Sequence, residues 1–186
     1  MEDKSPQQCI IPLHKPSTKE YIFFFASGIL VSIPFAFFFS SFYTFFPGAI
    51  AVILIAPFVE ELAKVFPLFY RHGETERSLM TLGLLTGLGF GVSELVLYVA
   101  LLNVPLVFRI PGVIFHASSA TITAYGVAKK KPLAYYLTSV VLHATNNFFA
   151  AGAVNVSFLV TILVVVIAIF LAWHFYDRAS KEKIVV

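Results

Sequence analysis

The sequence predicts an all-α, polytopic membrane protein: a six-transmembrane-helix bundle whose N- and C-termini are both cytoplasmic. Of its 186 residues, 59% are hydrophobic and only 12% are charged, and the mean hydropathy is +0.87. Soluble domains are about 45–50% apolar and about 25% charged, so this composition excludes an ordinary soluble domain. One cysteine in the whole chain also excludes a fold held together by internal disulfides.

Six apolar segments follow a polar N-terminal tail of residues 1–19, and each is long enough to form a transmembrane helix. A helix needs about 20 residues, at about 1.5 Å per residue, to cross the hydrocarbon core of a bilayer. We therefore expect one six-helix transmembrane domain over residues 20–177, followed by a basic cytoplasmic tail of residues 178–186. The six segments are 20–45, 48–70, 79–101, 106–128, 132–152 and 156–176.

The basic residues of the connections indicate how the chain is oriented. Eleven of the thirteen Lys and Arg residues lie in the N-terminal tail, the second and fourth connections and the C-terminal tail. The other connections contain none, and cytoplasmic loops are the ones enriched in Lys and Arg, so both termini are expected in the cytoplasm. Because the positive charge follows the topology, it does not indicate nucleic acid as a partner. The compact chain carries no sorting motif, which favours the cell membrane of a prokaryote.

Eight polar or ionisable side chains interrupt the apolar segments and are the best candidates for a functional site. A charge at membrane depth costs several kcal/mol. Such residues usually face the interior of the bundle or a water-filled cavity, and they mark functional sites. The eight are Glu60, Glu61, Lys64, Glu94, Arg109, His116, His143 and Asn147.

The second segment carries two adjacent carboxylates and a lysine within about one helical turn. Lys64 follows Glu60 by four residues and Glu61 by three, so it can neutralise either carboxylate. A single Glu–Lys pair would suffice to hold two helices together, and a second carboxylate adds repulsion and desolvation. One carboxylate is therefore expected to act as a general base. Pro57, which has no N–H, is expected to free the carbonyl of Ile53 beside them.

The third segment carries a stripe of glycines that leads to an acid. Gly83, Gly87 and Gly91 recur every four residues. Glu94 and Tyr98 continue the same helical face. Small residues at this spacing let another helix approach closely in lipid, so the stripe is expected to turn Glu94 toward a neighbouring helix. A hydrogen-bonded structural role and a catalytic role are equally open for this acid.

The fourth and fifth segments each carry a histidine with a polar residue on the same face. Arg109 and His116 are seven residues apart, and His143 and Asn147 are four apart. Two intramembrane histidines on different helices, together with the acids, indicate a single site. Counted from the segment ends, the groups near the midplane are Glu60, His116 and His143, and those in the outer half are Glu94, Arg109 and Asn147.

At these residues the chain resembles the PrsW-type intramembrane proteases, a branch of the superfamily that contains the CAAX prenyl endopeptidases and the bacteriocin-immunity (Abi) proteins. The resemblance covers the second to fifth segments, in the order of the family. It implies an all-helical membrane hydrolase that cleaves peptide bonds with a glutamate-activated water and needs no metal. The matching motifs are Glu60-Glu61-x-x-Lys64, Gly91-x-x-Glu94-x-x-x-Tyr98, Arg109 through His116 to Gly126, and His143-x-x-x-Asn147.

The resemblance also implies a role for each matching residue. Glu60 would be the general base with Glu61 assisting it, and His116 would position the water. His143 and Asn147 would hold the water or stabilise the oxyanion of the tetrahedral intermediate. The residues expected to support these groups are Lys64, Glu94, Arg109 and Asn146.

Two departures separate the chain from the CAAX branch. Lys64 stands one position earlier than the arginine of that branch, and Gly112 stands where that branch favours phenylalanine. Both departures argue against a prenylated-protein substrate and favour the PrsW-type proteases.

The sequence therefore predicts an intramembrane endopeptidase that acts, in contact with membrane lipid, on membrane proteins or lipidated peptides. The oligomeric state is left open. Three other functions compete with it: a CAAX prenyl endopeptidase-like activity, a proton-coupled transporter, and a non-enzymatic binding protein on the same scaffold. A fourth alternative is a zinc-dependent protease, whose ligands would be Glu60, Glu94, His116 and His143.

Overall fold

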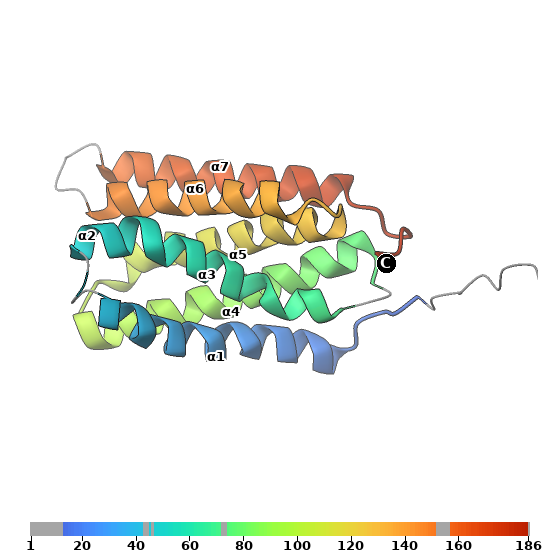
Figure 1. The fold of residues 1–186 in the computed structure, drawn as a ribbon, viewed down its shortest axis with the longest axis horizontal. Coiled ribbons are helices and arrows are strands. Elements are labelled where there is room, and N and C mark those ends of the chain that lie inside the picture. The colour runs from blue at the N-terminus through green and yellow to red at the C-terminus, as the bar shows by residue number, and fades with distance from the viewer. Residues whose placement is uncertain (1–12, 43–44, 46, 72–73, 152–156, 186) are drawn as a thin grey trace, which may run out of the picture.

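A computed structural model describes residues 13–42, 45, 47–71, 74–151 and 157–185 (Figure 1). Throughout these ranges the chain is helical apart from short connections and one isolated antiparallel bridge, so the predicted all-α class is confirmed. Most of the predicted N-terminal tail lies outside the described residues. Five long helices are α1 (Thr18–Phe42), α4 (Glu76–Leu102), α5 (Leu106–Ala128), α6 (Pro132–Ala151) and α7 (Ser157–Arg178).

The second predicted segment is helical but divided into four short pieces. Each piece follows the last without an extended residue between them, so the segment still runs the length of the bundle (Figure 1). Pro57 lies in the first turn of the third piece and Pro67 in that of the fourth, positions at which the missing N–H is tolerated. The pieces are α2 (Gly48–Ile50), the π-helix η1 (Ala51–Ile55), α3 (Ala56–Val65) and the 3₁₀ helix η2 (Phe66–Tyr70).

Helices α4 and α5 form the centre of the bundle. Helix α1 packs on α4, helices α6 and α7 pack on α5 and on each other, and α3 contacts α1, α4, α5 and α6. The described ends of the chain lie at the same end of the bundle (Figure 1). This arrangement surrounds α3 with the helices that carry the other candidate residues.

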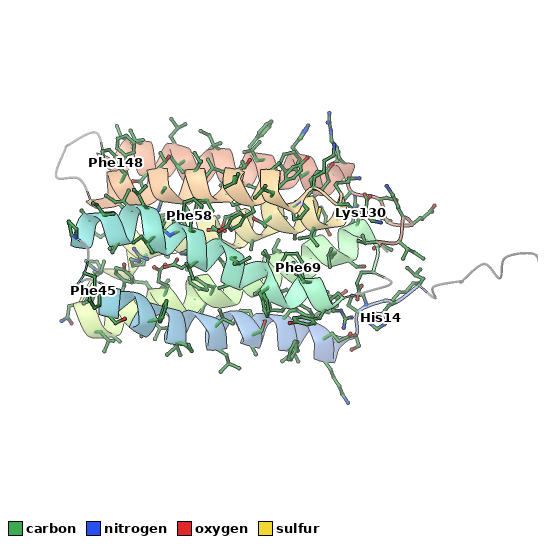
Figure 2. All side chains as sticks on the ribbon, in the orientation of Figure 1. His14, Phe45, Phe58, Phe69, Lys130 and Phe148 are labelled. Carbon is green, nitrogen blue, oxygen red and sulfur yellow. The ribbon has the colours of Figure 1, made fainter. Side chains whose placement is uncertain are left out.

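The bundle distributes its side chains as a membrane protein does. Three helices in the described part of the chain, α4, α5 and residues 158–178 of α7, have the length and composition to cross a membrane. Glu61 and Lys64 are completely buried, whereas Trp173 on α7 is 74% exposed. Figure 2 shows exposed Phe58 midway along the bundle and Lys130 at the end that carries the termini. Polar groups inside and apolar groups outside are what a bilayer requires.

The glycine stripe on α4 brings this helix into contact with the backbone of α5, as predicted. A Cβ atom on Gly87 would lie 2.3 Å from the carbonyl oxygen of His116. A Cβ atom on Gly91 would lie 2.7 Å from the Cα atom of Val113. Since real Cβ atoms do not approach this closely, only glycine permits this helix spacing. The stripe therefore sets the distance between the two helices that hold Glu94 and His116.

Replacing Gly87 by alanine should destabilise the bundle, because the new methyl group meets a main-chain oxygen that cannot rotate away. Overpacking of this kind typically costs about 1–3 kcal/mol. The matched control is Gly48→Ala, since a Cβ atom there would meet nothing within 4 Å. Thermal unfolding of the purified protein in detergent should show a lower Tm for Gly87→Ala than for the control. Equal Tm values would contradict the close α4–α5 contact.

The C-terminal tail is bound to the start of α4. Ile184 forms the isolated antiparallel bridge with Thr75, the N-cap of α4. The N–H of Ser180 donates to Oε2 of Glu76 at 2.9 Å, and the Lys129 ammonium at the end of α5 binds the same oxygen. The tail therefore joins the beginning of α4 to the ends of α5 and α7.

Candidate active site

Helix α3 contributes two carboxylates and a lysine, and the structure distinguishes between the two acids. The ammonium of Lys64 donates to Oε1 of Glu61 at 2.6 Å, and both side chains are completely buried. The i,i+3 spacing brings these two groups to one face of the helix. Lys64 therefore neutralises Glu61, one of the two pairings that the sequence allowed.

Glu61 is held by three neighbours at a single oxygen. Besides Lys64, its Oε1 accepts from Oγ of Ser119 on α5 at 3.1 Å. The same oxygen lies 2.8 Å from Nδ1 of His143 on α6. Three donors fix the buried carboxylate at Oε1, whereas its Oε2 has no hydrogen-bond partner among the described residues. Glu61 thus links helices α3, α5 and α6.

His116 on α5 is held at both ring nitrogens. Lys64 Nζ lies 2.9 Å from Nδ1, and Oε2 of Glu94 lies 2.7 Å from Nε2. An ammonium group only donates, so Nδ1 must accept and the ring proton is carried by Nε2, which donates to Glu94. Arg109 pairs with the same oxygen of Glu94 at 3.0 Å and stacks on the ring of Tyr98. The tautomer of His116 is therefore set by Lys64, and its partner acid is neutralised by Arg109.

His143 presents a free ring nitrogen to Glu60. In the neutral imidazole, Nδ1 of His143 donates to Glu61 and its Nε2 carries a lone pair. This nitrogen lies 3.7 Å from Oε2 of Glu60, which has no hydrogen-bond partner among the described residues. The Glu60 side chain is 16% exposed, whereas that of Glu61 is completely buried. Of the two adjacent acids, Glu60 is thus the one whose side chain is partly exposed and not paired with Lys64, although its Oε2 is itself buried.

Aromatic rings enclose the two histidines. The ring centroids of His116 and His143 are 5.1 Å apart, and the rings are nearly perpendicular. Phe90 lies 5.1 Å from the His116 ring, and Phe115 lies 5.3 Å from the His143 ring. These apolar walls lower the local dielectric constant, which strengthens the charge interactions inside the site.

The structure brings seven of the eight predicted intramembrane groups into one connected cluster, and the eighth lies one helical turn away. Asn147 follows His143 by one turn of α6, and its Nδ2 donates to the carbonyl oxygen of Val52 in η1 at 3.0 Å. Asn146 is half-buried, and its Oδ1 has no hydrogen-bond partner among the described residues. The connected groups are Glu60, Glu61, Lys64, Glu94, Arg109, His116 and His143.

The backbone beside the acids is not purely α-helical just before Pro57. The expectation that Pro57 frees the carbonyl of Ile53 assumes an α-helical register. The N–H of Ala56 binds the carbonyl of Ala51, five residues earlier, so the local register is that of a π-helix. The carbonyl that residue 57 would bind in this register is that of Val52.

Two serines support the site without having been predicted as site residues. Ser119 donates to Glu61, and its own carbonyl accepts from Oγ of Ser139 at 2.9 Å. Both serines are completely buried. Ser139 precedes His143 by four residues, so the periodicity of α6 already places it on the same face. That spacing was the available signal, but a buried serine in a membrane helix is too common to be assigned from spacing alone.

Three of the groups could also hold a metal ion. Glu60, His116 and His143 each offer one ligand atom, and these atoms all lie within 4.8 Å of one another. A second group of the same kind, formed by His14, Glu20 and Glu74, lies outside this site. There the Arg71 guanidinium binds both carboxylates, so one of their two negative charges is already compensated.

The comparison with known proteins agrees with the geometry. The sequence profile of the PrsW family, described as intramembrane metalloproteases, matches residues 16–173. No curated protein and no solved structure shows significant similarity to the chain. The matched region begins before α1 and ends within α7, so it includes every residue of the cluster. The chain therefore belongs to the PrsW family of intramembrane proteases.

Proposed function

We propose that this protein is an intramembrane endopeptidase that hydrolyses peptide bonds of membrane proteins or lipidated peptides with a water activated by Glu60. The observation that carries the proposal is the pair of acceptors that face each other at 3.7 Å, Oε2 of Glu60 and Nε2 of His143. When both groups are unprotonated there is no hydrogen between them, and a water molecule that entered would donate one hydrogen to each.

In this mechanism the water attacks the carbonyl carbon of the substrate while Glu60 takes one of its protons. The tetrahedral intermediate then breaks the C–N bond, and Glu60 returns that proton to the leaving amine nitrogen. General-base catalysis of this kind contributes typically about 10²–10⁴ in rate. Glu61 keeps His143 in the tautomer whose Nε2 accepts, so the water stays oriented toward the substrate.

His116 is the group best suited to stabilise the developing oxyanion. Lys64 fixes its tautomer, so Nε2–H can only donate. In the free enzyme this N–H donates to Glu94, which is neutralised by Arg109. A substrate oxygen that gains negative charge would compete with Glu94 for the same hydrogen, and the interaction would strengthen as the transition state forms.

A zinc ion on Glu60, His116 and His143, as the family description of metalloproteases would suggest, requires His116 to exchange one of its present hydrogen-bond partners for the metal. Catalytic zinc usually takes three protein ligands and one water. Glu60 and His143 each have a free ligand atom, but both nitrogens of His116 are already bound, one by Lys64 and one by Glu94. Of these three residues, only Glu60 and His143 have a ligand atom without a hydrogen-bond partner, so His116 could bind zinc only after losing its contact with Lys64 or Glu94. This supports the metal-independent mechanism, and zinc held by Glu60, His116 and His143 is the second candidate, favoured by the clustering of these atoms.

Chelation separates these two candidates. Treating the reconstituted protein with a membrane-permeant zinc chelator should leave the cleavage rate unchanged within about twofold, because the proposed base is a carboxylate. Elemental analysis of the untreated protein should find far less than one zinc per chain. One zinc per chain, together with activity that is lost on chelation and restored by zinc, would establish the metal-dependent alternative.

The proposed function is tested by reconstitution in lipid vesicles. The purified protein should cleave a set of single-span membrane proteins and lipidated peptides, with products identified by mass spectrometry. Comparing prenylated with unprenylated peptides tests the CAAX-like alternative, which predicts cleavage of the prenylated form only. Proton flux without any cleavage would support the transporter instead.

The remaining parts of the proposal concern topology and ancestry. A chain that crosses a prokaryotic cell membrane six times, with residues 20–177 as the catalytic domain and both termini in the cytoplasm, accounts for the distribution of basic residues. Reporter fusions in each connection would test it. The shared motifs also support descent from the CAAX protease and Abi superfamily.

A further inference from the structure

The helix that carries Glu60 is preceded by a carbonyl group that its own segment leaves without a donor. In an α-helical register the carbonyl of Val52 would accept from the N–H of Ala56, but that N–H binds Ala51 instead. In the π-helical register that this bond defines, the donor would be residue 57, which is a proline. The register and the proline together remove both main-chain donors.

Asn147 supplies the missing donor from helix α6. Its Nδ2 lies 3.0 Å from the carbonyl oxygen of Val52, and only the amide nitrogen of this side chain can donate. One turn earlier on the same helix, His143 binds Glu61. Asn147 and His143 therefore hold the second segment on either side of Glu60 and are joined by a rigid turn of α6. The Tyr136 hydroxyl of the same helix also donates to the carbonyl oxygen of Phe58.

We infer that Asn147 is a positioning residue, which holds the π-helical stretch so that Glu60 stays opposite His143. The inference rests on the proposed function, and it replaces the oxyanion role that the family resemblance implies. An oxyanion donor must point at the substrate, whereas this amide points at the main chain of Val52. π-helical turns occur often at functional sites, and here the turn is completed by a side chain from another helix.

The test uses the fact that Asn147 donates to the carbonyl that Pro57 cannot bind, that of Val52. If Asn147 serves only to satisfy Val52, an N–H at position 57 should make it dispensable. The set comprises Asn147→Ala, the isosteric Asn147→Asp, Pro57→Ala and the double variant Pro57→Ala/Asn147→Ala. Thr145→Ala is the control, because its exposed hydroxyl binds only its own helix. Each protein is examined in vesicles for kcat and for amide hydrogen exchange of residues 51–60.

We expect both Asn147 variants to speed amide exchange in residues 51–60 about tenfold or more, as loss of one buried hydrogen bond would. Their kcat should fall while KM changes little. The double variant should recover most of both properties, and the Thr145 control should match the wild type. Wild-type exchange in Asn147→Ala, or exchange that stays fast in the double variant, would overturn the inference.

Two further outcomes are informative. A kcat that stays low in the double variant, although exchange has recovered, would assign Asn147 to the substrate and also overturn the inference. If none of the proteins cleaves any substrate, the proposed function fails, but the exchange measurements still decide whether Asn147 holds the helix.

Discussion

Replacing Glu60 by glutamine is expected to abolish proteolysis while leaving the bundle folded. Glutamine has nearly the same shape but cannot take a proton from water, so the whole contribution of the general base is lost. That contribution is about 10²–10⁴ in rate. Stability should change little, because Oε2 of Glu60 has no hydrogen-bond partner among the described residues that could be left unpaired.

The measurement is kcat/KM of the reconstituted variant, with unfolding in detergent measured in parallel. Glu182→Gln is the matched control, since Glu182 is exposed in the C-terminal tail and far from the site in sequence. Activity of Glu60→Gln within tenfold of the wild type would mean that another group takes the proton. Loss of activity accompanied by unfolding would leave the assignment of Glu60 without support.

Replacing Lys64 by methionine should cause the largest loss of stability. Methionine keeps the apolar stem but leaves the Glu61 carboxylate completely buried without its cation. Breaking a buried ion pair by removing one partner typically costs about 3–5 kcal/mol. The change also releases Nδ1 of His116, so the ring is no longer restricted to one tautomer.

A double variant distinguishes the unpaired charge from a simple packing defect. In Glu61→Gln/Lys64→Met the charge is gone, and the glutamine oxygen can still accept from His143. We expect this variant to unfold at a higher temperature than Lys64→Met alone. Lys131→Met, at an exposed lysine, should match the wild type. A single variant as stable as this control, or a double variant no better than the single one, would argue against the buried pair.

The sequence was sufficient to predict where the helices lie and which polar groups meet. The apolar segments correspond to the observed helices within a few residues, because long apolar runs have no other stable form in a membrane. The cluster was predicted because Glu60, His116 and His143 lie at similar depths on different helices. Ionisable groups at that depth face the interior of the bundle and pair with one another.

The sequence could not predict how the partners are chosen within the cluster. Spacing allowed Lys64 to pair with either Glu60 or Glu61, and the outcome depends on Ser119 and His143, which come from other helices. The tautomer of His116 depends on a lysine 52 residues away in sequence. The pairing and the tautomer are determined by how the helices pack in three dimensions, and a local sequence pattern does not carry that information.

The π-helical backbone before Pro57 could not be predicted for a related reason. A π-helical turn inserts one residue per turn and changes which carbonyl loses its donor, and its sequence resembles that of any apolar helix. The sequence therefore could not predict that Asn147 binds a main-chain carbonyl. Only the position of Val52 relative to α6 shows that the amide serves the main chain.

The attachment of the C-terminal tail to the start of α4 has a consequence for biosynthesis. Glu76 gains the N–H of Ser180 only after helices α5, α6 and α7, which lie between the two residues in the sequence, have been made. Until then the buried carboxylate at the beginning of α4 lacks one of its donors. The attachment of the tail to α4 is therefore completed late in synthesis, whereas the contact between α4 and Lys129 on the end of α5 can form earlier.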